Sequence, residues 1–337
     1  MSTMATWPVF DLAAAEPAAL LAAFQQHGAL LVHDASVPLA ACDQALADLR
    51  WLFALPEADK ERLAIAHSPH FRGHSRMQNE RDHREQIHFG RERAAVAAER
   101  VATAPHLRLQ GPNLWPAAPG FRARMQAYVE AVEGVGIRLL RQLGKALDLE
   151  ARAWLGDEPY LLAKGIGYHP QPHRTAALRG VAAHLDFSLV TLTLQDDVGG
   201  LEVHRPDGSW SAVPSLPATW LVNIGELLQY VTGNRLVATP HRVVNPSLVR
   251  TRCSLPVFVN PSLATVLRRP ALGWLEPSVR PAGDEHVHAV LDPERPPDEL
   301  PFGPAEWRRK GENVWCRRCV SAPPRAAASG SPGCAPR

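Results

Sequence analysis

The sequence predicts a protein of mixed α and β class, in which a helical N-terminal half packs against one jelly-roll-like β-core. Residues 121–147 carry apolar side chains at steps of three and four, the spacing of one long amphipathic helix. From residue 160 to about residue 267, short runs rich in Val, Leu, Thr and Trp alternate with turn sequences, a pattern typical of antiparallel sandwiches and barrels. With 337 residues, the chain is long enough to bury a substantial core.

The N-terminal region is expected to supply strands and helices in turn. "WPVFDL" predicts a short strand, residues 17–26 predict a helix that Gly28 can cap, and a second strand is expected to end near His33. Residues 38–53 have apolar positions at helical spacing, and Pro56 can open another short helix. Residues 66–93 are polar, basic and rich in histidine, so we expect loop or irregular structure there.

These patterns divide the chain into four parts, which we treat as one structural unit. Residues 1–115 form an N-terminal module, residues 116–160 the region of the long supporting helix, and residues 161–267 the β-core. Residues 268–337 form a proline-rich C-terminal extension, whose last stretch is expected to be disordered.

Composition and charge exclude several classes of function. The formal net charge is +2 and no long block of like charge occurs, so neither nucleic acid nor an anionic membrane is an expected partner. No run of 18 apolar residues occurs, and the first residues lack the pattern of a signal peptide. The five cysteines form an odd, sparse set, which favours a reducing cytoplasm. "WCRRC" at residues 315–319 is a lone CxxC, for which we predict a loosely docked tail rather than a zinc site.

The chemistry of the chain is predicted to centre on "HLDFSLV" at residues 184–190. Side chains at i and i+2 on a strand share one face, so His184 and Asp186 can point together into a barrel mouth. A third ligand is needed, and His241 supplies it, 55 residues after Asp186 at the start of another apparent strand. Two histidines and one carboxylate on one side of an ion form the arrangement of non-haem Fe(II) oxygenases, which leaves positions for a cosubstrate and O₂.

Other histidines compete with this assignment. His286 and His288 form an HxH pair, and three more crowd one short segment: His67, His70 and His74. Because these residues lie in polar or proline-rich surroundings without a strand to fix their geometry, we expect them on the solvated surface. A bare HxD is common, and a lone histidine is more often structural than ligating, so the triad depends on its third member.

Arg252 and Ser254 strengthen the iron hypothesis. They stand at i and i+2 at the head of an apolar strand, eleven residues past His241. A guanidinium and a hydroxyl on one strand face can hold a carboxylate, which suits the distal carboxylate of 2-oxoglutarate. The competing interpretation of Arg252 is a surface arginine at a strand start.

With these residues assembled, the chain resembles the iron- and 2-oxoglutarate-dependent dioxygenases of the isopenicillin N synthase-like family over roughly residues 7–262. The matching segments are "PVFDL", "FALPEADK", "RDHREQIHFG", "HLDFSLVTLTLQDDVGGLEV", "GSWSAVP", "LVNIGELLQYVTGNRLVATPHRVV" and "RCSLPVFVNP". The resemblance implies a double-stranded β-helix core, a non-haem dioxygenase N-terminal module, and a structural turn at Gly199 and Gly200. It also implies His184, Asp186 and His241 as iron ligands.

The same resemblance implies that Arg252 and Ser254 bind 2-oxoglutarate and that Arg84 and Glu85 lie in a segment along the substrate side of the mouth. The chain departs from the family pattern at Leu185, where we expect little effect because this side chain should point away from the metal, and at Glu226, where members often have Asp. A third departure is more consequential, because members commonly place a tyrosine directly before the proline of a "YP" pair. Here the run is "GYHPQP", so His169 takes that position and Tyr168 the preceding one. His169 either replaces the tyrosine hydroxyl beside the cosubstrate or substrate, or that contact is missing.

The leading functional prediction is a 2-oxoglutarate- and Fe(II)-dependent oxygenase that uses O₂, hydroxylates a small molecule and releases succinate and CO₂. Desaturation or cyclisation of the substrate are alternative outcomes of the same chemistry. A second hypothesis is an Fe(II) oxidase of the same family that uses O₂ alone, with Arg252 and Ser254 holding a substrate carboxylate. A third is a non-catalytic binding protein. We expect a cytoplasmic monomer or weak homo-oligomer, with bacterial secondary metabolism as its setting, and the pattern does not identify the substrate.

Overall fold

The computed structural model describes residues 7–78, 82–170, 179–244, 247 and 249–267, and its strands form two sheets. The larger sheet has the spatial order β1 (Val9–Asp11), β2 (Ala29–His33), β10 (Thr219–Ile224), β7 (Val190–Gln195), β12 (Arg252–Asn260), β5 (Tyr160–Tyr168), β4 (His83–Gly90) and β3 (Gly73–Gln78). The smaller sheet has the order β6 (Arg179–His184), β11 (His241–Val244), β8 (Leu201–His204) and β9 (Trp210–Ala212). Among these strands β1 and β2 pair in parallel, and the other pairings are antiparallel.

The two sheets enclose a small apolar interior. Ile166 and Tyr168 on β5 share one buried cluster with Val181 on β6 and Val243 on β11. The even-numbered residues of β5 therefore face the smaller sheet, because side chains alternate along a strand. This is the jelly-roll arrangement predicted for residues 161–267, and it brings β6 and β11 over the face of the larger sheet.

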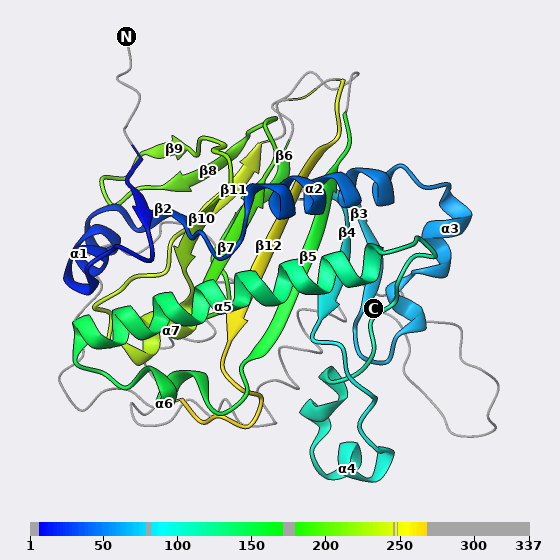
Figure 1. Cartoon of the computed structure of the whole chain (residues 1–337), viewed down its shortest axis with the longest axis horizontal. Helices are drawn as coiled ribbons and strands as arrows, with labels where there is room; N and C mark the ends of the chain where they lie inside the picture. The colour runs from blue at the N-terminus through cyan, green and yellow to red at the C-terminus, as the bar shows by residue number, and fades with distance from the viewer. Residues whose placement is uncertain (1–6, 79–81, 171–178, 245–246, 248, 268–337) are drawn as a thin grey trace, which may run out of the picture.

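The opposite face of the larger sheet is covered by helices, which Figure 1 shows lying across it. The described chain has the helices α1 (Pro17–His27), α2 (Leu39–Phe53), α3 (Glu57–Arg62), α4 (Ala98–Thr103), α5 (Phe121–Leu147), α6 (Ala151–Leu155) and α7 (Glu226–Val231), with short 3-10 turns at Ile65–His67 and Pro105–Leu109. Of these, α4 buries no residue and lies away from the sheet (Figure 1). The helix α2 packs close to β5, where a Cβ added to Gly165 would lie 2.3 Å from Leu49 Cδ2 and one added to Gly167 would lie 2.7 Å from Phe53 Cδ2. Glycine at these two positions lets the helix approach the strand.

Most of the predicted elements are confirmed. The helix α5 covers residues 121–147 as predicted, and the apolar side chains whose spacing predicted it are buried. The helix α1 ends at Gly28, which has a φ of 74° and donates its N–H to the carbonyl of Phe24. Gly199 and Gly200 form the expected turn between β7 and β8, with φ values of 78° and 86°. The extension from residue 268, with its HxH and CxxC predictions, lies outside the described residues.

The prediction of irregular structure for residues 66–93 is wrong. This segment contains β3 and β4, which form a hairpin at the edge of the larger sheet. Its strands escaped detection because their buried side chains are largely polar: Ser75, Glu85, Gln86 and His88 are all buried. The N-terminal region therefore forms a helical layer and also contributes four strands to the larger sheet.

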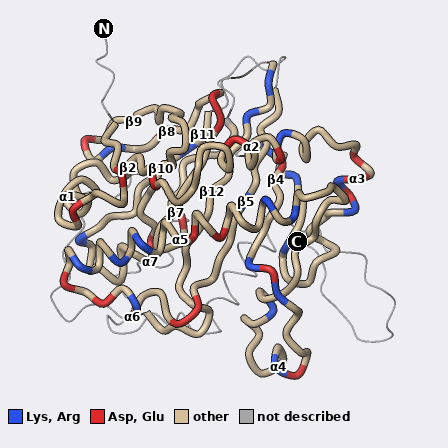
Figure 2. Tube along the Cα trace, viewed as in Figure 1, with Lys and Arg blue, Asp and Glu red and all other residues tan. Residues whose placement is uncertain are grey.

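The prediction that His70 and His74 lie on the surface is also wrong, because both side chains are buried. His67 is exposed, as predicted. His70 Nδ1 lies 2.8 Å from the carbonyl oxygen of Arg108, and His74 Nε2 lies 2.9 Å from Glu85 Oε2. The partner of His70 lies 38 residues away, and that of His74 lies on the other strand of the hairpin, so the local polarity of the segment misled the prediction. Figure 2 shows basic and acidic residues interspersed along the trace. Within the described chain, every helix is too short or too polar to cross a membrane.

Candidate metal centre and cosubstrate site

The structure brings the three predicted metal ligands together at the edge of the smaller sheet. His184 ends β6, His241 begins β11, and the two residues are direct partners in the β6–β11 register. Asp186 follows His184, with its Oδ1 at 3.7 Å from His184 Nε2 and its Oδ2 at 3.6 Å from His241 Nε2. One ligand atom from each residue lies within 4.8 Å of the others, and no second cluster of this kind occurs in the described ranges.

Hydrogen bonds fix which nitrogen of each histidine faces Asp186. His184 Nδ1 lies 2.9 Å from the carbonyl oxygen of Ala182, and His241 Nδ1 lies 3.1 Å from that of Thr239. A carbonyl oxygen only accepts, so each Nδ1 carries the proton and donates it. The Nε2 lone pairs are therefore left for a ligand, as in metal-binding histidines that a backbone carbonyl orients.

Electrostatics at the triad favour a cation. Burial, and then the neighbouring His241, lower the pKa of His184 to about 3, so this imidazole is neutral at ordinary pH. Burial disfavours the charged form of Asp186, yet the adjacent histidines and a hydrogen bond from Asn223 hold its pKa below the ordinary value. The Asn223 side chain donates to Asp186 Oδ2 at 2.9 Å. Two imidazole nitrogens and one carboxylate fit a divalent ion such as Fe(II).

The loop that carries Asp186 is held by the start of α7. The backbone N–H of Glu226 donates to the carbonyl of Asp186, and that of Leu227 donates to the carbonyl of Ser188. Gly225 makes this approach possible, because a Cβ there would lie 2.1 Å from the Ser188 carbonyl oxygen. The hydrogen bond that Glu226 makes to Asp186 comes from its backbone, so this contact does not depend on the departure of its side chain from the family pattern.

Arg252 is fully buried, at 0% exposure, on the face of β12 that looks toward the smaller sheet. Its Nε donates to the Gly199 carbonyl at 2.5 Å, its Nη1 to Ser254 Oγ at 3.2 Å and its Nη2 to Gln195 Oε1 at 3.0 Å. Over the described residues, all its hydrogen bonds thus go to neutral groups. A buried guanidinium without a carboxylate partner is costly, so this site is suited to an anionic ligand. Sequence reasoning missed Gln195, which orients the guanidinium from β7.

Strand alternation gives Tyr168 and His169 opposite directions. Tyr168 is buried in the interior, where a Cβ added to Gly180 of β6 would touch its ring. The guanidinium carbon of Arg252 lies 4.9 Å from the centroid of the Tyr168 ring. His169 instead lies beyond the end of β5, where its Nδ1 is 3.1 Å from Thr251 Oγ1 and its Nε2 contacts Glu85. Tyr168, and not His169, is thus the aromatic residue beside Arg252.

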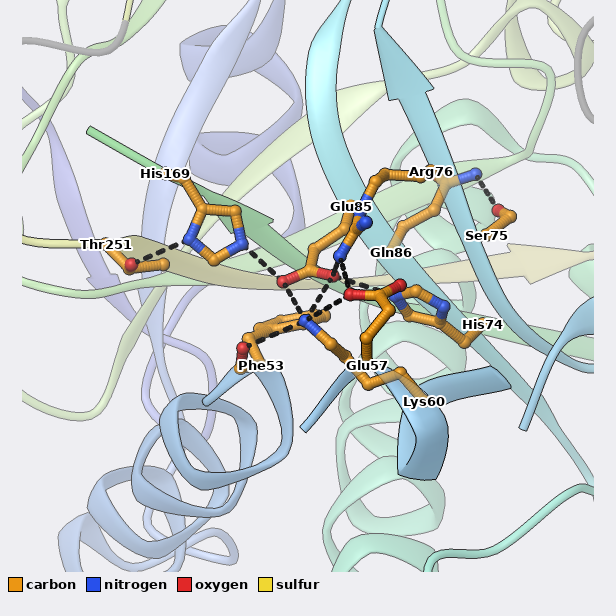
Figure 3. Close-up of polar contacts among 10 residues, drawn as sticks. All are labelled: Phe53, Glu57, Lys60, His74, Ser75, Arg76, Glu85, Gln86, His169 and Thr251. Atoms are coloured by element: carbon orange, nitrogen blue, oxygen red, sulfur yellow. Dashed lines mark hydrogen bonds and ion pairs between the residues drawn. The ribbon is translucent and has the colours of Figure 1, made fainter. Parts of the chain in front are cut away.

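Figure 3 shows the cluster around Glu85 on the helix-covered side of the sheet. We call Glu85, Lys60, His74, Arg76 and His169 the Glu85 cluster. The Glu85 carboxylate is fully buried and lies 3.2 Å from Lys60 Nζ, 2.9 Å from His74 Nε2 and 3.3 Å from Arg76 Nη2. Glu85 pairs with Gly167, which packs on α2, so its side chain lies on the helix-covered face and not, as the resemblance implies for its segment, on the substrate side. Its members come from α3, β3, β4 and the end of β5, so no local pattern predicts it.

Comparison with known proteins agrees with this geometry. Residues 157–261 match the 2OG-Fe(II) oxygenase superfamily, and residues 8–118 match the family described as "non-haem dioxygenase in morphine synthesis N-terminal". A 2-oxoglutarate-dependent dioxygenase from Gibberella zeae is 32% identical over 262 residues, which cover 70% of this chain and 68% of the relative. The chain belongs to the 2-oxoglutarate- and Fe(II)-dependent oxygenases.

Solved structures of these oxygenases share the fold. A 2OG-Fe(II) oxygenase family protein from Caulobacter crescentus has a TM-score of 0.70 at 25% identity, over 93% of this chain and all of that one. A Neurospora crassa protein, solved in complex with alpha-KG and thymine, has a TM-score of 0.68 at 20% identity, over 80% of this chain and 90% of that one. The oxygenase family uses Fe(II), 2-oxoglutarate and O₂ and acts on small molecules.

Proposed function

We propose that His184, Asp186 and His241 hold the Fe(II) of this oxygenase, and that Arg252 and Ser254 receive the distal carboxylate of 2-oxoglutarate. The observation that carries the first assignment is the convergence of the three ligand atoms within 4.8 Å, with both Nε2 lone pairs directed by backbone carbonyls. The second rests on the buried Arg252, whose hydrogen-bond partners are neutral.

Bound Fe(II) supplies the activation of O₂, which couples the decarboxylation of 2-oxoglutarate to succinate and CO₂ with oxidation of the substrate. The chain's own residues bind and orient the reactants. Asp186 contributes one negative charge, so a divalent ion keeps a positive charge for the anionic cosubstrate. Arg252 and Ser254 fix the far end of that cosubstrate, and Tyr168 packs against the guanidinium, which limits its movement.

Hydroxylation of a small molecule is the outcome that we propose, with desaturation or cyclisation as variants. We further propose that the enzyme works in the cytoplasm as a monomer or weak homo-oligomer, without a nucleic-acid partner. The near-neutral formal charge of +2 supports the last point.

The test measures O₂ uptake and succinate release with and without 2-oxoglutarate, in the wild type and in Arg252→Ala. We expect no turnover without 2-oxoglutarate, and a Michaelis constant for 2-oxoglutarate raised by roughly tenfold or more in the variant, because a charge-assisted hydrogen bond is lost. Arg250→Ala is the matched control, since Arg250 is exposed and pairs with Asp197. Robust turnover without 2-oxoglutarate, or an unchanged Michaelis constant in Arg252→Ala, would contradict the cosubstrate assignment.

A further inference from the structure

One face of β4 looks into the space between the sheets. Gln86 of β4 is paired with Ile166 of β5, which belongs to the interior cluster, so Arg84, Gln86, His88 and Gly90 share the inward face. The strand β6, which carries His184, packs against β4. This face of the hairpin is therefore directed toward the strand that holds the candidate metal site.

Basic side chains gather on this inward face. His88 is directly opposite Lys164 of β5, and the Arg72 guanidinium lies over Gly90, where an added Cβ would be 2.2 Å from Arg72 Nη2. We call Arg72, Arg84, His88 and Lys164 the basic wall.

The pKa of His88 reflects the positive charges of the basic wall. Burial comes first among the causes that hold the pKa of His88 well below its ordinary value, and three positive charges follow, those of Lys164, Arg72 and Arg84.

The two arginines of the basic wall lack carboxylate partners among the described residues. Arg72 is 2% exposed and donates to the Tyr160 hydroxyl and the Leu109 carbonyl, while Arg84 donates to Met77 Sδ at 3.5 Å. The Nε atoms of both arginines are buried without a hydrogen-bond partner, as is Gln86 Oε1.

The other face of the same hairpin is different. There, on the side of the Glu85 cluster, Arg76 contacts the carboxylates of Glu57 and Glu85, and Lys60 contacts Glu85 (Figure 3). Of the three arginines of this region, only Arg76, on the outer face, has acidic partners within the described chain. Buried guanidinium nitrogens without an acceptor are costly, so the unsatisfied Nε atoms of Arg72 and Arg84 point to a ligand that compensates them.

We propose that the basic wall binds an oxyanionic group of the substrate, so that the substrate class is small organic anions, carboxylates or phosphate monoesters. This inference rests on the proposed function, because it assigns the substrate of the same oxygenase site. Arg84 is the central residue, with an Nε–Nη edge that can meet an oxyanion in bidentate fashion. The orphaned Gln86 oxygen can accept a hydrogen bond from a donor elsewhere on the same molecule.

The test is a calorimetric titration of the full chain, loaded with Mn(II) and saturating 2-oxoglutarate under anaerobic conditions so that the Arg252 site is already filled. The probes are benzoate, phenyl phosphate and the neutral benzamide. We expect at least one anion to bind more tightly than benzamide, and Arg84→Met to weaken its binding by roughly tenfold, the loss of one charge-assisted hydrogen bond. The stronger of the two anions identifies the group that the basic wall prefers.

Arg62→Met is the matched control, since Arg62 is an exposed arginine that pairs with Asp59, and it should leave anion binding unchanged. The ligand-free unfolding midpoint of Arg84→Met should equal or exceed that of the wild type, because an unpaired charge is removed; this also establishes that the variant folds. Equal binding of benzamide, no anion binding at tens of millimolar, or full anion affinity in Arg84→Met would overturn the proposal. Failure of Mn(II) and 2-oxoglutarate to bind in the preceding titrations would instead count against the proposed function.

Discussion

At the scale of single residues, strand alternation decides which aromatic side chain serves the cosubstrate site. The sequence "GYHP" places His169 before the proline, where the family pattern has tyrosine. The structure directs Tyr168 to the interior beside Arg252, and directs His169 toward Glu85 and Thr251. The tyrosine that a linear comparison finds missing is therefore present one position earlier, on the inward face.

This arrangement predicts different consequences for Tyr168→Leu and His169→Gln. Tyr168→Leu removes the ring that packs against the guanidinium, which is an interaction of about 0.5–2 kcal/mol, so the Michaelis constant for 2-oxoglutarate should rise several-fold. His169→Gln alters the opposite face and should change that constant less than about twofold, while lowering stability by about 1–3 kcal/mol, the cost of a disturbed buried hydrogen bond. Steady-state kinetics and urea unfolding measure both effects. A larger kinetic effect for His169→Gln than for Tyr168→Leu would refute the assignment of Tyr168.

At the scale of secondary-structure elements, the Glu85 cluster joins the β3–β4 hairpin to α3 and to the end of β5. A fully buried carboxylate with several cationic or histidine partners connects these elements. The same hairpin carries Arg84 and His88 on its other face, so its placement sets the position of the basic wall. The cluster thus acts on the interior through the backbone of β4.

The electrostatics of Glu85 predict an acid-sensitive contribution to stability. Burial alone raises the pKa of Glu85, but hydrogen bonds from His169 and His74 overcome it and hold the pKa far below the usual 4.5. Because the folded pKa is lower than the unfolded one, this contribution is complete above the unfolded value and is lost as the pH falls below it.

Glu85→Gln should therefore reduce the free energy of unfolding by about 3–5 kcal/mol at pH 7, since it leaves Lys60 buried without its carboxylate. The difference between wild type and variant should shrink as the pH is lowered from 5 to 3. Urea unfolding at each pH measures it, with the exposed Glu61→Gln as a control. A difference that stays constant with pH would show that the charge of Glu85 does not stabilise the fold.

At the scale of the whole molecule, the candidate site depends on chain segments that are far apart in sequence. The triad comes from β6, β11 and the loop after β6, Arg252 comes from β12, and Tyr168 comes from β5. Metal binding is therefore linked to the folding of both sheets, and a ligand that binds only the folded chain must stabilise it.

We expect Mn(II) together with 2-oxoglutarate to raise the free energy of unfolding by about 2.7 kcal/mol at concentrations of one hundred times the dissociation constant. Asp186→Ala should abolish the part of this rise that depends on metal, because it removes the only charged ligand of the triad. Asp197→Ala is the control: Asp197 is exposed in the turn after β7, and this variant should retain the metal-dependent rise. Thermal and urea unfolding with and without metal measure the effect, and a full metal-dependent rise in Asp186→Ala would exclude the triad as the metal site.

The sequence by itself determined the elements whose side chains repeat with a regular period. The stripe of α5 and the short apolar runs of the β-core are local patterns, because burial of apolar side chains follows the geometry of a single helix or strand. The HxD motif and the RxS pair were equally visible, since each lies within one strand or at its end. His241 was found by seeking a third ligand at the start of another strand.

Only the tertiary structure decided how the polar residues are used. The strand β3 has no apolar alternation, and β4 shows it only at Ile87 and Phe89. Glu85, Lys60 and His74 are buried because they neutralise one another across α3, β3 and β4. The opposite directions of Tyr168 and His169, and the inward face of Arg84 and His88, depend on strand register. Register is set by pairing and packing between strands, so it leaves no mark in a local stretch of sequence.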